Sequence, residues 1–286
     1  MKKLITKVRN WMSPKYWRNP PPRVAVVRLS GVIAERQGLK SGLCLTSLDP
    51  VLEQAFGLSK VKAVALCINS PGGSPVQSAL IAKRIRALAL EKKVPVYAFC
   101  EDVAASGGYW LAACADEIYA DANSIIGSIG VVSGGFGFTG LIEKIGVERR
   151  MYTSGDQKAM LDPFSPEKPS DVKHLKSLQS EIHQNFKDMV RDRRGDKLNG
   201  TDKKLFSGAF WTGTASLELG LIDGLGDMHE ILREKFGDKV VLKPFKASRS
   251  WRQGLFSSKA GDTLNTLSAE AVATIEDRLV WNQYGL

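Results

Sequence analysis

Short apolar runs alternate with longer segments of helical spacing through the first 120 residues of the chain. Residues 24–29, 61–68 and 94–100 are the apolar runs, and residues 76–93 place apolar side chains three and four positions apart. Strands that alternate with helices of this length are typical of β-α-β units. The pattern therefore predicts an α/β fold with a mostly parallel sheet and flanking helices.

The later part of the chain continues with longer helices. We expect a helix at 106–115, strands at 117–120 and 147–153, a long amphipathic helix at 170–194, two short helices within 212–236 and a last amphipathic helix at 262–282. The 286 residues, 43% of them hydrophobic, are enough for one large core. We expect a basic tail with a proline linker at 1–23, one domain at 24–246 and a second tail at 247–286.

Positive charge is concentrated at the start of the chain. The formal net charge is +10, and residues 1–23 hold seven Lys and Arg and no acid. Because Trp11 and Trp17 lie among these charges, residues 1–20 could bind an anionic membrane surface, although a solvated terminus has the same composition. No recognition motif accompanies the charge, so no nucleic-acid partner is expected.

Neither a cleavable signal peptide nor a clear transmembrane helix is expected. The basic start is broken by Arg9 and runs into prolines. Residues 122–142 carry no charge, but six glycines make turns around a site a better interpretation than a helix in lipid. The four cysteines lack metal-ligand spacing, and Cys67 and Cys100 lie in apolar runs where Cys is usually a core residue. We therefore expect no disulfide, metal or cofactor.

Two segments that directly follow predicted strands could carry chemistry. Residues 69–73 read Asn-Ser-Pro-Gly-Gly, and such a turn can aim free amides at an oxyanion, although it is also typical of an ordinary turn before a helix. Ser106 stands among small residues at the predicted start of a helix. It is either a nucleophile near the positive end of the helix dipole or simply the helix cap.

A serine nucleophile needs a base. The three histidines, His174, His183 and His229, lie in charged helical segments and are interpreted as surface residues, which disfavours a Ser-His-Asp triad. Lysine can act as the base where it is desolvated. Lys158 follows a predicted strand and turn and precedes an apolar pair, but composition alone does not distinguish it from a solvated lysine.

Four blocks of the sequence together resemble peptidase family S49, the signal peptide peptidase A and SohB group. They are Ile-Asn-Ser-Pro-Gly-Gly at 68–73, Ala-Ala-Ser-Gly-Gly-Tyr at 104–109, Ile-Gly-Ser-Ile-Gly-Val at 126–131, and Ser-Gly at 154–155 followed by Lys158 and Pro-Phe at 163–164. The resemblance covers roughly residues 24–235. It implies a ClpP/crotonase-like fold and a serine peptidase of the short, single-domain type.

The resemblance also implies roles for individual residues. Ser106 matches the nucleophile and Lys158 the general base of a Ser-Lys dyad. Ser128 matches a serine that hydrogen-bonds the lysine. Gly73 and Gly107 match the oxyanion donors, with Gly72 as an alternative to Gly73. Two features depart from the family pattern: Asp156 stands close to Lys158, and the N-terminal membrane helix of many relatives is missing.

The expected partners follow from the same resemblance. They are apolar peptides such as cleaved signal peptides, and further copies of the chain in a homo-oligomeric ring. We expect peripheral membrane association, at a bacterial inner membrane or from the cytoplasm. Three alternatives remain: a ClpP-like peptidase with a histidine base, a crotonase-type acyl-CoA enzyme, and a catalytically silent peptide-binding or membrane scaffold.

Overall fold

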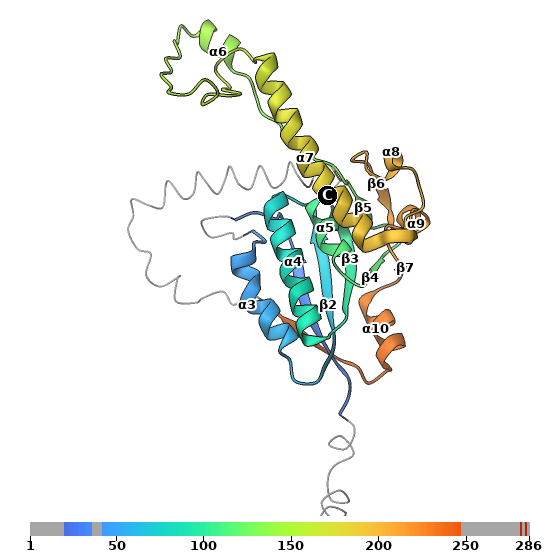
Figure 1. Ribbon diagram of the computed structural model, residues 1–286. Helices are drawn as coiled ribbons and strands as arrows, with labels where there is room; N and C mark the ends of the chain where they lie inside the picture. The colour runs from blue at the N-terminus through green and yellow to red at the C-terminus, as the bar shows by residue number, and fades with distance from the viewer. Residues whose placement is uncertain (1–19, 36–41, 247–280, 282–283, 285–286) are drawn as a thin grey trace, which may run out of the picture.

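The fold is built on one twisted, mostly parallel sheet. The computed structural model describes residues 20–35, 42–246, 281 and 284 (Figure 1). The strand order is β6-β5-β3-β2-β1-β8, with β4 paired to β3 and β7 paired to β4. Every pairing is parallel except that of β5 with β6. The α/β class with a mostly parallel sheet and flanking helices is thus confirmed.

The strands are β1 (Arg23–Ser30), β2 (Val61–Ser70), β3 (Val96–Ala105), β4 (Glu117–Ala120), β5 (Ile125–Gly127), β6 (Phe210–Thr212), β7 (Gly224–Leu225) and β8 (Val241–Phe245). The helical elements are α3 (Leu45–Phe56), α4 (Pro75–Lys92), α5 (Gly107–Ala113), α6 (Thr139–Lys144), α7 (Pro169–Arg194), the 3₁₀ turn η1 (Gly195–Lys197), α8 (Asp202–Leu205), α9 (Gly213–Glu218) and α10 (Met228–Phe236). None of the helices in these described ranges is both long and apolar enough to cross a bilayer.

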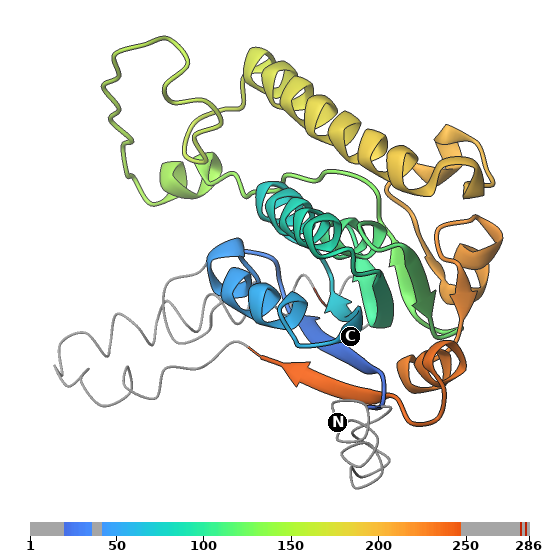
Figure 2. The same ribbon diagram turned by 60° about the horizontal axis from the view of Figure 1, so that its bottom comes forward.

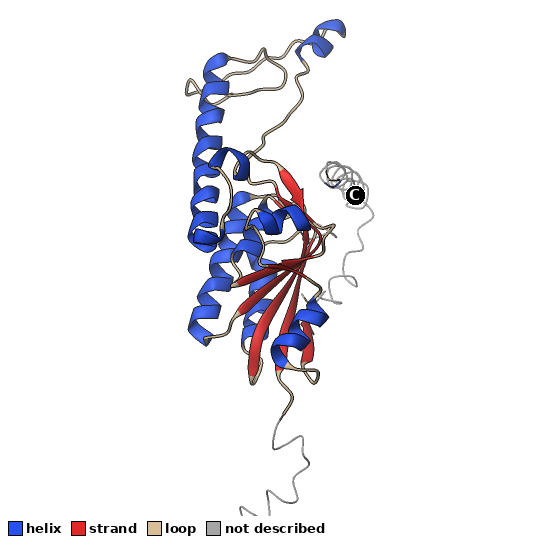
Figure 3. Cartoon of the chain, turned by 90° about the vertical axis from the view of Figure 1, so that its right-hand side faces the viewer, coloured by secondary structure: helices blue, strands red, loops and turns tan. Residues whose placement is uncertain are grey.

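Helices cover the two faces of the sheet unequally (Figures 2 and 3). The larger core lies under α3, α4, α5 and the second half of α7, where Trp110 stacks on Phe186 at 4.6 Å between ring centroids. On the other face, α10 covers a smaller cluster with Ile231 and Leu232. The first face therefore carries most of the buried apolar area that stabilises the fold.

Most of the predicted elements are confirmed, with one clear error. The strands at 24–29, 61–68, 94–100 and 117–120, the helices at 76–93, 106–115 and 170–194 and the helix pair within 212–236 all appear within a few residues. The strand predicted at 147–153 is wrong: these residues are exposed, and within the described ranges no neighbouring strand takes their backbone hydrogen bonds. The helix predicted at 262–282 and the basic tail at 1–19 lie outside the described residues, apart from Trp281.

Residues 131–168, called the arm below, project from the body of the protein. Figure 1 shows α6 and the segment that leads into α7 at the end of α7 far from the sheet, and Figure 3 shows the same arrangement from the side. Phe138 stacks on Phe164 at 5.5 Å within the arm. Other large apolar side chains point to solvent, including Val132 at 89% exposure and Tyr152 at 92%. The arm thus presents an apolar surface that the described residues of this chain leave uncovered.

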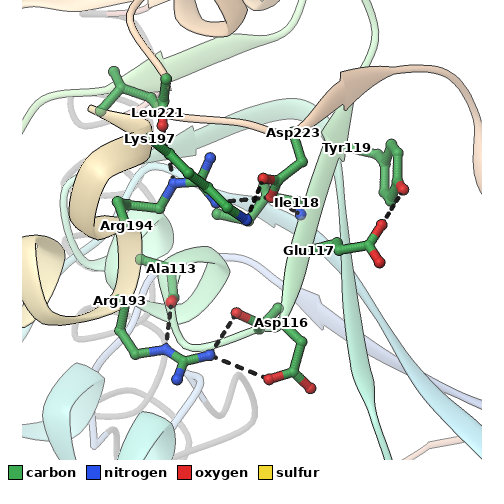
Figure 4. Close-up of polar contacts among 12 residues, drawn as sticks. Ala113, Asp116, Glu117, Ile118, Tyr119, Arg193, Arg194, Lys197, Leu221 and Asp223 are labelled. Atoms are coloured by element: carbon green, nitrogen blue, oxygen red, sulfur yellow. Dashed lines mark hydrogen bonds and ion pairs between the residues drawn. The ribbon is translucent and has the colours of Figure 1, made fainter. Parts of the chain in front are cut away.

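A buried arginine ties the end of α7 to the sheet (Figure 4). Arg194, only 3% exposed, donates to the Gly220 carbonyl at 2.9 Å and to Asp223 at 2.7 Å. Asp223 also accepts from Lys197 at 2.7 Å and from the backbone N–H of Ile118 at the start of β4 at 2.8 Å. One carboxylate thereby joins α7, η1 and the sheet.

The charge of Asp223 should make stability depend on pH. Burial by itself raises the pKa of Asp223, but hydrogen bonds from Arg194 and Lys197 hold it below its ordinary value. A carboxyl whose pKa is lowered by folding stabilises the native state above its unfolded pKa of about 4. That contribution is lost as the pH falls through the native-state pKa.

We predict that Asp223→Asn costs about 3 kcal/mol at neutral pH, because it leaves the Arg194 guanidinium buried without a counter-charge. Thermal unfolding between pH 7 and pH 3 measures the effect. The difference in unfolding temperature between Asp223→Asn and the unmodified protein should become smaller as the pH falls. Asp196→Asn, at an exposed aspartate in η1, is the matched control and should leave the transition unchanged. A pH-independent difference would contradict the ionic explanation.

Candidate functional site

Two serines leave neighbouring strands at the same end of the sheet. Ser106 follows β3 and Ser128 follows β5, and these strands pair in parallel with Ala105 opposite Gly127. The N–H of Ser106 donates to the carbonyl of Gly127 at 2.8 Å. Because the register continues beyond the strands, the two predicted site serines lie beside each other.

Ser106 has a strained backbone that presents its hydroxyl. Its φ is 52° and its ψ is −121°, a region that costs a non-glycine residue about 1–3 kcal/mol. Its carbonyl accepts from Trp110 at 3.0 Å in the first turn of α5, but its side chain makes no capping hydrogen bond. Ser106 therefore occupies the N-cap position of α5, but its side chain does not act as the cap. No described residue hydrogen-bonds its hydroxyl.

Two backbone amides next to Ser106 have no acceptor among the described residues. They belong to Gly107, the first residue of α5, and to Gly73 in the loop after β2. A Cβ built on Gly72 would lie 2.8 Å from both the Gly107 nitrogen and the Ser106 Cβ, so this loop packs directly against the serine. The Gly72 amide, by contrast, donates to the Ser70 hydroxyl at 3.2 Å. This geometry favours Gly73 over Gly72 as the partner of Gly107.

The close approach of these loops requires glycine. Gly73 has a φ of 139°, and an added Cβ would lie 2.1 Å from the carbonyl oxygen of Ile33. Ile33 in turn donates to the Gly72 carbonyl at 2.7 Å and accepts from Ser74 at 2.7 Å. The segment around Ile33 thereby fixes the direction of the Gly73 amide.

The hydroxyl of Ser128 is hydrogen-bonded to a residue that is distant in sequence. Its φ is also 52°, and its N–H donates to the Ala209 carbonyl at 2.7 Å. The hydroxyl of Tyr284 donates to the Ser128 Oγ at 3.3 Å. Nε2 of His183 lies 3.1 Å from the carbonyl oxygen of Ile129, so the ring must donate there and links α7 to this strand end.

Within one chain, the structure does not bring Lys158 to the serines. Lys158 is exposed in the arm, where its N–H donates to the Gly155 carbonyl at 3.2 Å. The arm lies at the end of α7 far from the sheet, whereas α5, which follows Ser106, packs beside the second half of α7 (Figure 1). Of the predicted site residues, Ser106, Ser128, Gly72, Gly73 and Gly107 thus gather together, and Lys158 stands apart.

A cavity of about 450 Å³ lies elsewhere, where β1, β2 and β3 face the start of α10 and the end of β8. It is lined by Cys67, Met228 and Phe245 among others, and Arg28 and Glu101 pair in its wall at 2.6 Å. None of the six predicted site residues lines it. Burial raises the pKa of the Cys67 thiol there to about 11, so this sulfur is a neutral core group rather than a reactive thiolate.

Sequence reasoning missed two neighbours of Ser128. His183 was interpreted as a surface residue, yet it lies three and seven positions before the buried Phe186 and Val190, and that spacing places it on the inner face of α7. No feature of the sequence points to Tyr284. Its contact with Ser128 spans 156 positions in the sequence, which no local pattern can reveal.

Comparison with known proteins identifies the family of this site. Residues 88–241, more than half of the chain, match peptidase family S49. The Haemophilus influenzae protein "Protease 4" is 34% identical over 268 residues, which are 92% of this chain and 42% of that protein. The Arabidopsis thaliana protein "Serine protease SPPA, chloroplastic" is 32% identical over 72% of this chain and 31% of its own length.

Two Brucella proteins are more similar but carry a different name. The protein named "Na(+)/H(+) antiporter NhaA" in Brucella abortus is 49% identical over 282 residues, as is its counterpart in Brucella melitensis. The alignment covers 96% of this chain but only 38% of those proteins, so the chain spans about two fifths of their length. The antiporter name is not carried over, because the shared residues match a peptidase family.

We predict that Gly73→Ala destabilises the protein by about 2 kcal/mol or more, because a Cβ at a φ of 139° meets the Ile33 carbonyl, which is backbone and cannot rotate away. Urea unfolding measures the change. Gly134→Ala is the control, since an added Cβ there meets nothing within 4 Å. Equal stability of the two variants would show that the Gly73 loop can relax.

Proposed function

The chain belongs to peptidase family S49, and on that premise we propose that it is a serine endopeptidase in which Ser106 is the nucleophile and Lys158 the general base. One observation carries the proposal. The hydroxyl of Ser106 makes no capping hydrogen bond and lies on a strained turn. Beside it are the Gly73 and Gly107 amides, neither of which has an acceptor among the described residues. Such a group of donors suits an anion that forms next to a serine during acyl transfer.

The proposed reaction proceeds in two halves. Ser106 Oγ attacks the peptide carbonyl as Lys158 takes the hydroxyl proton, and the Gly73 and Gly107 amides bind the developing oxyanion. The lysine then passes the proton to the leaving amine, and an acyl-enzyme remains. Water attacks the ester with Lys158 again as base, which releases the acid and restores Ser106. Ser128 would accept a hydrogen bond from the lysine and orient it.

Lys158 would reach Ser106 from a neighbouring copy of the chain. Its own arm holds it away from the sheet, and the arm exposes Val132, Phe136 and Tyr152 to solvent. Packing of the arm against a second copy would bury these side chains and desolvate the lysine, and a lysine needs that setting to act as a base. In a closed ring of identical subunits, each arm would pack against the next subunit, and each Ser106 would receive a Lys158 from its neighbour.

The proposed substrates are extended, apolar peptides, of the kind left by signal peptide cleavage. Supporting this, Val76 and Leu80, exposed by 65% and 41%, lie on α4 directly after the Gly73 loop and offer apolar contacts to a peptide. Peripheral membrane contact through residues 1–20 remains a prediction, because residues 1–19 lie outside the described ranges.

We predict that only the unmodified protein hydrolyses a fluorogenic apolar peptide, when it is compared with Ser106→Ala and Lys158→Ala. Loss of either group should reduce kcat by at least about 10³-fold, because each is needed for the same step. Circular dichroism of both variants controls for folding. Equal activity of all three proteins would favour an acyl-thioester or scaffold role instead.

We predict that mixed assemblies of the Ser106→Ala and Lys158→Ala chains regain activity, although neither works alone. At equal mixing, about a quarter of the sites combine an intact serine with an intact lysine from the adjacent copy. Coexpression of the two chains followed by peptide hydrolysis measures this. The double variant coexpressed with Lys158→Ala is the control and should stay inactive. Inactive mixtures of assembled protein would place the base within the same chain.

A further inference from the structure

Ser70, the last residue of β2, is fully buried and uses its hydroxyl in two hydrogen bonds. Its Oγ donates to the Gly31 carbonyl at 2.7 Å and accepts from the Gly72 N–H at 3.2 Å. Because a hydroxyl has a single proton, Gly31 receives that proton and the oxygen lone pairs serve Gly72. The side chain thereby joins the segment after β1 to the loop after β2.

Hydrogen bonds fix both of the peptide planes that flank Gly72. The Ser70 oxygen holds the plane between Pro71 and Gly72 through its N–H. The Ile33 N–H holds the next plane through the Gly72 carbonyl at 2.7 Å, and the Gly73 N–H points to the opposite side of that plane because the peptide bond is planar and trans. Glycine would otherwise leave both planes free to rotate. The direction of the Gly73 amide therefore depends on both bonds.

Ser70 also fixes the segment that holds the second plane. The Gly31 N–H donates to the Asn69 carbonyl at 2.9 Å, and the Gly31 carbonyl accepts from the Ser70 hydroxyl. Both sides of Gly31 are thus bonded to the end of β2, and Ile33 follows two residues later. Loss of the Ser70 hydroxyl would release Gly72 directly and would also loosen the segment that carries Ile33.

The helix that carries the other free amide packs on the same serine. A Cβ built on Gly108 would lie 2.4 Å from the Ser70 carbonyl oxygen and 3.2 Å from the Ser70 Cβ. The first turn of α5, which begins at Gly107, therefore lies directly against Ser70. One buried residue contacts both of the segments that present the Gly73 and Gly107 amides.

We propose that Ser70 is a positioning residue, which sets the direction and spacing of the Gly73 and Gly107 amides. The inference rests on the proposed function, in that it assigns these amides to the oxyanion. Ser70 is buried behind the loop and does not touch the substrate. The oxyanion forms only after Ser106 has attacked, so the effect of Ser70 falls on the transition state rather than on substrate binding.

Hydrolysis of an apolar peptide by Ser70→Ala tests the proposal. The substitution should lower kcat by about 10²-fold and leave KM within about twofold, because displaced amides weaken only the interaction made in the transition state. A peptide aldehyde is the second probe, since Ser106 Oγ adds to its carbonyl carbon and the former carbonyl oxygen then meets the two amides. Its affinity should fall by the same factor as kcat.

Ser124→Ala is the matched control. Ser124 is 2% exposed, and its hydroxyl likewise accepts from a backbone N–H, that of Asp121 at 3.1 Å, and donates to a carbonyl, that of Cys100 at 3.3 Å. Both alanine variants lose the same kind of hydrogen bonds, so thermal unfolding should show a similar loss of stability. Only Ser70→Ala should lose kcat and aldehyde affinity.

The possible failures are distinguishable. Equal kcat in the two variants, whether retained or reduced, would overturn the positioning role and leave the peptidase function standing. If Ser70→Ala does not fold, Ser70→Cys replaces it, because a thiol keeps a weak donor and acceptor in the same place, and it should show the same selective loss of kcat. Unmodified protein that neither hydrolyses the peptide nor binds the aldehyde would overturn the proposed function, and the inference with it.

Discussion

The backbone hydrogen bond from Ser106 to Gly127 organises the candidate site. It extends the β3–β5 ladder one residue beyond the strands, where both chains turn sharply. The turn at Ser106 starts α5 and brings the Gly107 amide against the loop that contains Gly72 and Gly73. The turn at Ser128 directs its hydroxyl toward the same end of the sheet. Without this register, the two serines and the glycine amides would not lie close together.

The rest of the fold keeps that register in place. The Arg194–Asp223 pair anchors the end of α7 to the start of β4, and Trp110 of α5 stacks on Phe186 of the same helix. His183 of α7 then reaches the Ile129 carbonyl, one residue after Ser128. A single long helix thus supports the strand end from one side and carries the arm at its other end.

Sequence alone could place the serines and glycines but not the lysine. The apolar runs before residues 70 and 106 are long enough to be strands, and parallel strands end at one edge of a sheet, so the loops after them had to converge. Lys158 lies in the arm, exposed and away from the sheet, and no periodic pattern in the sequence shows where such a loop residue packs. The strand predicted at 147–153 does not form, because no strand in the described part of the chain lies beside it. The contact of Tyr284 with Ser128 is likewise tertiary and leaves no local trace.

The positive φ values of Ser106 and Ser128 restrict which amino acids can replace them. Threonine offers the same hydroxyl chemistry, but its branched Cβ clashes with the backbone at a φ of 52°, where serine is already strained. Cysteine, unbranched and of similar shape, fits this geometry. The backbone at these positions therefore accommodates a cysteine but not a threonine, although threonine is chemically closer to serine.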